Sequence, residues 1–310
     1  MGLLSQSANI VDIFINGESN GLYVQHEKMD ELFLRKNKLM PVNIYKGSNN
    51  SQERYIGLDT NLFNNAGMWT KLAYFNQQDT NDKSDLENFF LRLKKNDSDV
   101  DVSLNNFIDL EYFSKFEAFL TLLQNDHHYW RDNLRLIVDP WNGKVTQIIT
   151  DPEIRRFDKV YIDFSTNDLN TYLNKNSEFI HKKYEWLYHY LKKEKLIKKI
   201  SQYIDKVEDD FQIADQREPY ENTGLNFSKS FRNEIDNLKR TEDKILDILE
   251  KRPNSSWSKN DTGIALVLYD YTPLHDLTFY FDKSTSLEWL GIDLNNDKKI
   301  SKEEPIFYLE

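Results

Sequence analysis

The most informative segment of the chain is residues 125–153, which read NDHHYWRDNLRLIVDPWNGKVTQIITDPE. An apolar run at residues 134–138 is followed by the turn sequence DPWNG and by a second strand-like run at residues 144–149. Asp, Pro, Asn and Gly favour chain reversal, so the segment predicts a β-hairpin. Because the two outer ends of a hairpin lie side by side, we expect Asn133 and Asp151 to lie at the same end.

Side chains that carry oxygen surround this hairpin. Asp126 and Asn133 precede its first strand, and Asp151 and Glu153 follow its second. Phosphotransferases bring an Asp to the acceptor hydroxyl, an Asn to Mg²⁺ and a strand-end Asp to the metal. Mg²⁺ needs few protein ligands, because water and phosphate complete its octahedron. The pattern therefore predicts Asp126 as a catalytic base and Asn133, Asp151 and Glu153 as metal ligands.

Two adjacent histidines, His127 and His128, lie inside the same segment. Neighbouring residues on a regular element cannot both face one pocket, so we expect structural or supporting roles for them. The chain contains no G-x-S-x-G motif, which argues against a serine hydrolase with a nucleophile elbow.

The composition limits the class of protein. The 310 residues include 51 acidic and 40 basic side chains, for a net charge of −11, and 39% are hydrophobic. This balance disfavours electrostatic binding to nucleic acid or to anionic membranes. The absence of cysteine excludes disulfides and Cys-ligated zinc. We expect no membrane span, because no window approaches the roughly 18 apolar residues required, and the first residues do not predict an export signal.

Hydrophobic period and turn residues predict the remaining elements. We expect strands at residues 11–15, 22–25, 42–46, 263–271 and 277–282, and helices at residues 27–37, 86–95, 105–124, 168–173, 177–206 and 228–251. Residues 48–82 show no sustained period and are predicted to form a loop with short elements. These elements predict an α+β fold with a domain at residues 1–253 and a β-rich module at residues 254–310.

A second, independent motif lies near the C-terminus and fits the twelve-residue EF-hand calcium loop. The predicted calcium ligands are Asp293, Asn295, Asp297, Lys299 through its carbonyl, Ser301 and Glu304. Lys298 stands where the loop normally has the Gly of its sharp turn. The alternative interpretation is an acidic turn that binds no calcium.

The run NGESNGLYVQHEKMDELFL at residues 16–34 resembles the CotH spore-coat family of atypical, kinase-like proteins. Members carry NGxxxGLYxxxExxD, then a short helix and a Tyr-Lys strand, which is Tyr45-Lys46 in this chain. The resemblance covers about residues 8–252, including the hairpin. The chain has Thr150 where the family has Trp, Glu153 where it has a second Asp, and seven residues from Asp126 to Asn133 rather than the five of an ordinary kinase loop.

This resemblance implies a protein-kinase-like fold with a reduced N-lobe, a helical C-lobe and a small β-rich C-terminal module. It implies that the family's upstream N-lobe is missing from this chain. It also implies nucleotide-binding roles for Glu27, Asp30 and Lys46, and it supports the roles given above to Asp126, Asn133 and Asp151.

The expected function is transfer of the ATP γ-phosphate to a protein Ser or Thr, with Mg²⁺ or Mn²⁺ as cofactor. A non-catalytic surface or structural protein that retains nucleotide or calcium binding is the alternative. A metal-dependent phosphohydrolase that uses Asp126, Asp151 and Glu153 is a third hypothesis. The family resemblance suggests a spore-surface or extracellular location, and the sequence does not predict the oligomeric state.

Overall fold

The computed structural model describes residues 2–48, 61–75, 79, 81–95, 104–129, 132–155, 159–217, 227–251, 255–260, 263–268, 289–291 and 306–308. The chain divides into two compact units, Met1–Pro273 and Leu274–Glu310. The domain boundary predicted at residue 253 rests on the change of period in the sequence and stays a prediction. None of the described helices is both long and apolar enough to cross a membrane.

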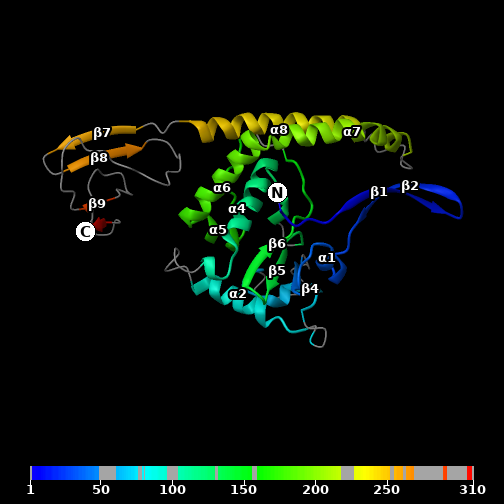
Figure 1. Cartoon of the computed structure of the whole chain (residues 1–310), viewed down its shortest axis with the longest axis horizontal. Helices are drawn as coiled ribbons and strands as arrows, with labels where there is room; N and C mark the ends of the chain where they lie inside the picture. The colour runs from blue at the N-terminus through cyan, green and yellow to red at the C-terminus, as the bar shows by residue number, and fades with distance from the viewer. Residues whose placement is uncertain are drawn as a thin grey trace. The chain divides into compact units, whose positions relative to one another are not determined.

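The fold is α+β, as predicted from the sequence (Figure 1). Described in chain order, the elements of the first unit are β1 (Ala8–Ile15), β2 (Glu18–His26), α1 (Glu31–Lys36), β3 (Asn43–Gly47), η2 (Ala66–Met68), β4 (Trp69–Ala73), α2 (Ser84–Lys95), η3 (Leu104–Asn106), α4 (Leu110–Leu123), η4 (His127–Tyr129), β5 (Arg135–Asp139), β6 (Lys144–Gln147), α5 (Asp168–Asn174), α6 (Ser177–Tyr188), the π-helical turn η5 (His189–Lys193), α7 (Leu196–Arg217), α8 (Phe227–Glu250), β7 (Ser255–Asn260) and β8 (Gly263–Leu268).

A four-stranded antiparallel sheet of order β4-β3-β5-β6 organises the centre of this unit. The predicted hairpin is confirmed as β5 and β6, which pair from Leu136 with Gln147 to Asp139 with Lys144. The turn between them closes when the Gly143 N–H donates to the Asp139 carbonyl. Strand β4 lies in the region predicted as a loop with short elements, and it is specified by pairing with β3 rather than by a period of its own.

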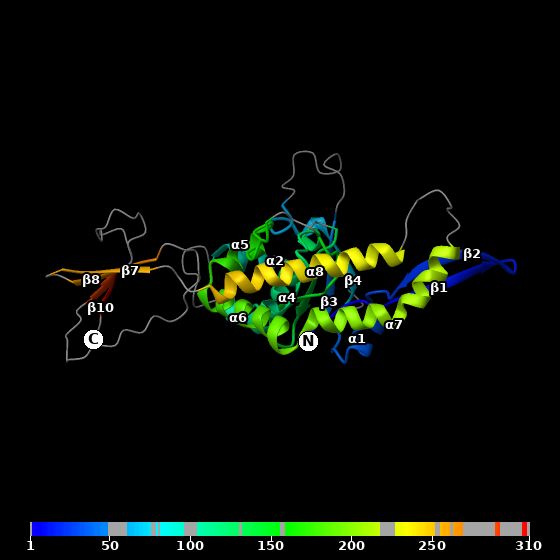
Figure 2. The ribbon, with the colours of Figure 1, turned by 90° about the horizontal axis from the view of Figure 1, so that it is seen from above.

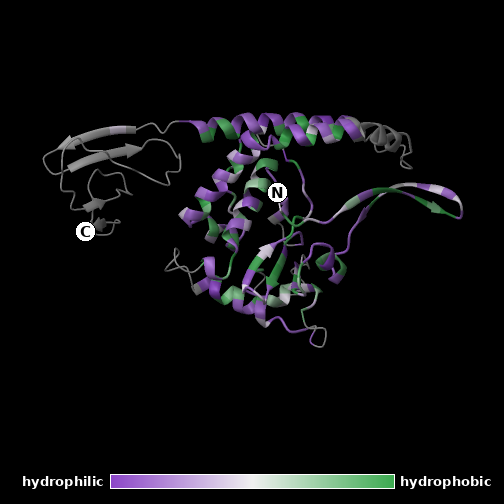
Figure 3. Cartoon of the chain, in the orientation of Figure 1, coloured by the Kyte–Doolittle hydropathy of each residue, from purple (hydrophilic) through white to green (hydrophobic). Residues whose placement is uncertain are grey.

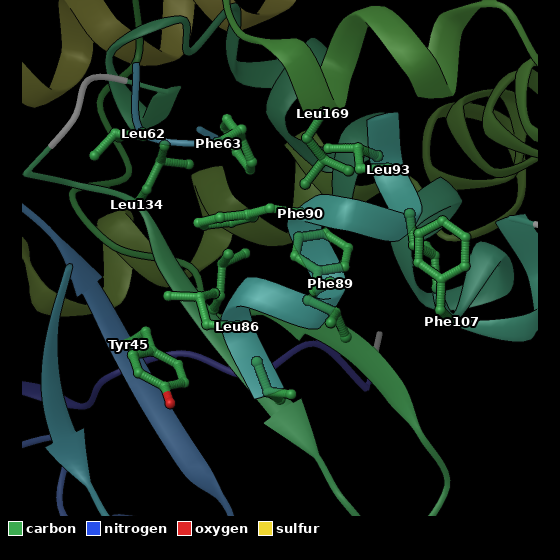
Figure 4. Packing of buried hydrophobic residues seen from close by; sticks show 14 of the residues in the cluster. Tyr45, Leu62, Phe63, Leu86, Phe89, Phe90, Leu93, Phe107, Leu134 and Leu169 are labelled. Carbon is green, nitrogen blue, oxygen red and sulfur yellow. The ribbon is translucent and has the colours of Figure 1, made fainter. Parts of the chain in front are cut away.

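Successive side chains along each strand point to opposite faces of the sheet, so they pack into two separate cores. One face carries Tyr45 and Leu136, which pack against α2 and its neighbours. Figure 4 shows how the apolar side chains of α2 meet this face: Leu86, Phe89, Phe90 and Leu93. Ile44 and Ile137 belong to the other core, which includes buried residues of α1. Full burial of each large side chain contributes about 1.5–3 kcal/mol relative to exposure.

Helix α4 connects the sheet to the helical part of the unit. Its first turn is capped by Asp109, whose carboxylate accepts from the Tyr112 N–H at 3.0 Å. The helix begins five residues later than predicted, because residues before this cap form η3. It ends at Gln124, which adopts a left-handed φ of 53° and so redirects the chain into Asn125 and Asp126.

Helices α4 and α6 lie side by side, and α7 and α8 pack against each other (Figures 1 and 2). The single helix predicted over residues 177–206 is wrong. It is interrupted by η5 and by Lys195, whose φ of 51° no right-handed helix accommodates. Along α8 the apolar residues recur at helical spacing between polar ones (Figure 3), and Ile235, Leu238 and Ile245 are buried against α4 and α7.

The N-terminal hairpin is confirmed as β1 and β2, which are joined by a turn at Asn16 and Gly17, both with positive φ. The helix predicted from residue 27 begins at Glu31, because Asp30 caps it: the Asp30 carboxylate accepts from the Leu32 N–H at 2.9 Å.

Strands β7 and β8 form an antiparallel pair at the end of the first unit. In the second unit, β9 (Trp289–Gly291) pairs antiparallel with β10 (Ile306–Tyr308). The strand predicted at residues 277–282 lies outside the described residues, as do the six predicted calcium ligands.

Candidate active site

The loop after α4 is tied to the end of the β5–β6 hairpin through Asn125, which is fully buried. Its amide donates to the Asp151 carbonyl at 3.0 Å, and its side-chain oxygen accepts from the His128 N–H at 3.1 Å. Two segments about 25 residues apart in sequence are thus joined at one point. This tie positions Asp126 and His127 next to the strand-end residues.

The hairpin brings Asn133 and Asp151 together, as predicted. The Thr150 hydroxyl donates to the Asn133 carbonyl, and the Asn133 amide lies 3.4 Å from Oδ2 of Asp151. This contact is a hydrogen bond from the amide nitrogen, so it places the two side chains next to each other, and Oδ1 of Asn133 is the atom that would bind a cation.

His127 lies between the two carboxylates that follow β6. Its Nδ1 is 2.9 Å from Oδ2 of Asp151 and 3.4 Å from Oε2 of Glu153. The Asn133 amide donates to the His127 carbonyl at 3.0 Å, so the backbone of His127 is held as well as its side chain. The imidazole thus connects Asp151 to Glu153.

Arg155 connects Asp126 to the same group. Its Nη1 forms an ion pair with Oδ1 of Asp126, and its Nε lies 3.5 Å from Oε2 of Glu153. The Arg155 N–H donates to the Leu123 carbonyl at 3.1 Å, which fixes the backbone against the end of α4. Hydrogen bonding to Asp126 raises the pKa of Arg155 further above its usual range.

These contacts form a continuous chain from the predicted base to the predicted metal ligands. We use the term hairpin site for its six residues, which are Asp126, His127, Asn133, Asp151, Glu153 and Arg155. The Asp126, Glu153 and Arg155 side chains retain 27%, 45% and 29% of their exposure, so a solute can reach them. The structure therefore brings all four sequence-predicted residues of this segment into one group.

Asp151 holds an unusual backbone conformation at the centre of the hairpin site. Its φ is 47°, in the left-handed region, where Asp is tolerated better than most residues but still at a cost. Its carbonyl accepts from the Glu153 N–H at 2.8 Å, which closes a tight turn. Such strain is concentrated at functional sites.

His128 is completely buried, whereas the His127 side chain is partly exposed. Its ring packs edge-to-face on Phe116, with ring centres 5.0 Å apart, and its Nδ1 lies 3.2 Å from the Thr150 carbonyl. Burial lowers the pKa of His128 to about 4, so the ring is neutral and Nδ1 is the donor. This side chain supports the site from the core.

Two of the residues proposed for nucleotide binding are held within the N-terminal segment. The Glu27 carboxylate accepts from the Ser7 N–H at 3.2 Å and from the Lys36 ammonium at 2.9 Å. Hydrogen bonding to Lys36 lowers the pKa of Glu27. Asp30 is the cap of α1.

The third, Lys46, lies on β3 and is opposite Arg135, the first residue of β5. The Gly47 N–H donates to the Leu134 carbonyl at 3.1 Å, directly after Asn133. Lys46 therefore lies at the end of the sheet that carries the hairpin site. Glu27 and Asp30 form their contacts elsewhere in the unit.

Whether the hairpin site suits a metal depends on its donor set. Among the described residues, no group of three or more His, Asp and Glu side chains has the geometry of a ready-made metal cage. Asn133 and Asp151 nonetheless supply hard oxygen atoms, and Mg²⁺ takes only one or two protein carboxylates and obtains its other ligands from water and phosphate. The residues present therefore fit a cation that binds together with a nucleotide.

Sequence reasoning did not assign a role to Arg155 or a central position to His127. Arg155 lies two residues after Glu153, and this closeness to the predicted metal ligands was the one sequence feature that could have pointed to a role for it. Its contact with Asp126 spans 29 residues and depends on the path of the intervening hairpin.

Comparison with known proteins identifies the family of this chain. No curated protein matches the chain. Residues 1–244 match the profile of a protein family described as CotH kinase protein. The match covers most of the chain, including β1, β2, the sheet and the whole hairpin site. The chain therefore belongs to the CotH kinase family.

Proposed function

We propose that this chain transfers the γ-phosphoryl group of ATP to a Ser or Thr hydroxyl of a protein, with Mg²⁺ or Mn²⁺ as cofactor. The observation that carries the proposal is the continuous contact from Asp126 through Arg155, Glu153 and His127 to Asp151. It brings the proposed base near the proposed metal ligands at one accessible end of the sheet, which supports a role in phosphoryl transfer.

In the proposed reaction Asp126 accepts the proton of the acceptor hydroxyl. The hydroxyl oxygen forms a bond to the γ-phosphorus, and the bond from that phosphorus to the β,γ-bridging oxygen breaks, so ADP leaves with the bridging oxygen. Asp126 is bound by Arg155 on one side and remains partly exposed, so an acceptor can approach it.

Asn133 and Asp151 would hold the divalent cation, with Glu153 as a further oxygen donor. When bound, Mg²⁺ or Mn²⁺ neutralises charge on the β- and γ-phosphates. His127, at 2.9 Å from Asp151, orients that carboxylate. The nucleotide-binding roles of Glu27, Asp30 and Lys46 are part of this proposal, and the position of Lys46 beside the first residue of β5 supports its role most directly.

The calcium loop at residues 293–304 is a separate proposal. Gly291 on β9 pairs with Ile306 on β10, so the described residues on either side of this motif lie next to each other, which supports the proposal. Calorimetric titration of the whole chain with calcium should show one binding event, and the Glu304→Gln variant should lose it. Equal heat from both proteins would remove the proposal.

Incubation of the chain with γ-labelled ATP, Mg²⁺ or Mn²⁺ and a generic protein acceptor tests the proposed reaction. We expect label in protein Ser or Thr, and a loss of at least about 100-fold in rate for Asp126→Asn. A labelling rate for Asp126→Asn equal to that of the wild type would refute the assignment of the base. Release of labelled phosphate without protein labelling would instead indicate a phosphohydrolase that uses Asp126, Asp151 and Glu153.

A second candidate function is nucleotide binding without transfer, in a surface or structural protein. The specific observation in its favour is the ion pair that occupies the Asp126 carboxylate. Thermal stabilisation by ATP in the absence of any label transfer would support it over the enzyme.

A further inference from the structure

Arg155 is the feature of the hairpin site that the proposed roles leave unused. It contacts the predicted base, Asp126, with Nη1 and the predicted metal-binding carboxylate, Glu153, with Nε. The guanidinium therefore lies between the group that would meet the acceptor hydroxyl and the groups that would hold the cation. In phosphoryl transfer, the γ-phosphate occupies this interval.

We propose that Arg155 is the cation that binds the γ-phosphate of ATP during transfer. This inference rests on the proposed function and adds a residue to it. A guanidinium has five N–H donors in a planar fork that matches two oxygen atoms of a phosphate. The two ion-pair contacts use Nη1 and Nε, and a phosphate can replace either carboxylate as the acceptor without moving the backbone of Arg155.

The negative charge of the hairpin site also favours a role for Arg155 in binding phosphate. Three carboxylates, those of Asp126, Asp151 and Glu153, are grouped with one guanidinium. A nucleotide triphosphate that enters this group meets net repulsion unless a divalent cation and Arg155 together neutralise it. Side-chain exposure of 29% leaves Arg155 within reach of a ligand while Leu123 fixes its backbone.

The alternative is that Arg155 is only a structural partner of Asp126. The two roles differ in their dependence on the number of phosphates. A residue that contacts the γ-phosphate affects ATP and leaves ADP unaffected, whereas a residue that holds the loop in place affects both nucleotides equally.

Isothermal titration of the full chain with ATP and with ADP, in MgCl₂, separates these roles. The Arg155→Met variant should bind ATP about 10- to 100-fold more weakly, the usual consequence of losing one charge-assisted hydrogen-bond pair, and should bind ADP as the wild type does. Arg155→Lys keeps the charge but not the fork, so an intermediate loss is expected. The control is Arg92→Met, at an exposed position of α2, which should leave both affinities unchanged.

Equal ATP affinity of wild type and Arg155→Met would overturn the inference, as would a parallel loss of ATP and ADP binding. Thermal melting of each variant establishes that it is folded before titration. A wild-type chain that shows the predicted ATP selectivity but transfers no label would retain the phosphate contact and refute the proposed function. A wild-type chain that binds neither nucleotide would refute both.

Discussion

At the scale of single residues, Asp151 combines backbone strain with contacts that its role requires. Its left-handed φ of 47° points the carboxylate toward Asn133 and His127. The sequence predicted that Asp151 would meet Asn133, because that contact follows from the hairpin. It did not predict the strained conformation, which depends on the turn that Glu153 closes with the Asp151 carbonyl.

Substitution of Asp151 should separate strain from function. Asp151→Gly should be more stable than Asp151→Ala by about 1 kcal/mol, because only Gly adopts the left-handed region without cost, and both should lose phosphate transfer. Urea unfolding of the two variants measures the difference. At Glu153, which is not among the described residues with positive φ, the order should reverse. If the Gly variant were the more stable one at both positions, the inferred backbone strain at Asp151 would be contradicted.

His128 should make the protein less stable as the pH falls. Its pKa in the folded state is about 4 against 6.5 for an exposed histidine, because burial disfavours the charged ring. Between these values the unfolded chain binds more protons than the folded one, so the free energy of unfolding decreases as the pH falls from about 6.5 to about 4, by up to about 3 kcal/mol. The charged groups that face the ring are Arg135, which lowers its pKa further, and Asp151, which raises it.

Replacement of this histidine by glutamine tests the assignment. His128→Gln should be less stable at pH 7 but should show a much flatter dependence of unfolding free energy on pH across this window. Denaturant titrations of the wild type and of His128→Gln at several pH values give the slope of the unfolding free energy against pH for each protein. If the two slopes agree within error, another group is responsible for the acid sensitivity.

At the scale of elements, α4 determines where the base lies. The helix is capped by Asp109 at one end and ends in the left-handed Gln124 at the other. The sequence predicted its apolar stripe but placed its start five residues early, because η3 continues the same hydrophobic spacing. Strand β4 was predicted only as one of the unspecified short elements of residues 48–82, because five residues that are specified by pairing to β3 carry little pattern of their own.

Removal of the α4 cap should weaken folding without damage to the site. Asp109→Ala should lower the free energy of unfolding by about 0.5–2 kcal/mol, because the Tyr112 N–H loses its acceptor. Asp109→Asn retains an acceptor and serves as the control. Nucleotide affinity under native conditions should be equal in all three proteins, since the cap lies at the end of α4 remote from Asp126. A loss for Asp109→Asn as large as for Asp109→Ala would show that charge rather than hydrogen bonding matters there.

At the scale of the whole molecule, the parts of the site that are close in sequence could be predicted, and those that depend on tertiary contacts could not. Asn133 and Asp151 meet because one hairpin connects them. Asp126 joins them through Asn125, whose buried amide binds the Asp151 carbonyl, and through Arg155. Neither contact has a signature in the sequence, because each depends on where α4 stops relative to the sheet.

The most direct test of the account is whether Asn133 and Asp151 bind one and the same cation. Mn²⁺ affinity in the presence of ATP can be measured by electron paramagnetic resonance for the wild type, Asn133→Ala, Asp151→Asn and the double variant. We expect each single variant to bind Mn²⁺ at least about tenfold more weakly, and the double variant to lose less than the sum of the two losses, because both side chains contact one ion. Full affinity in either single variant, or two strictly additive losses, would contradict a shared cation at the hairpin site.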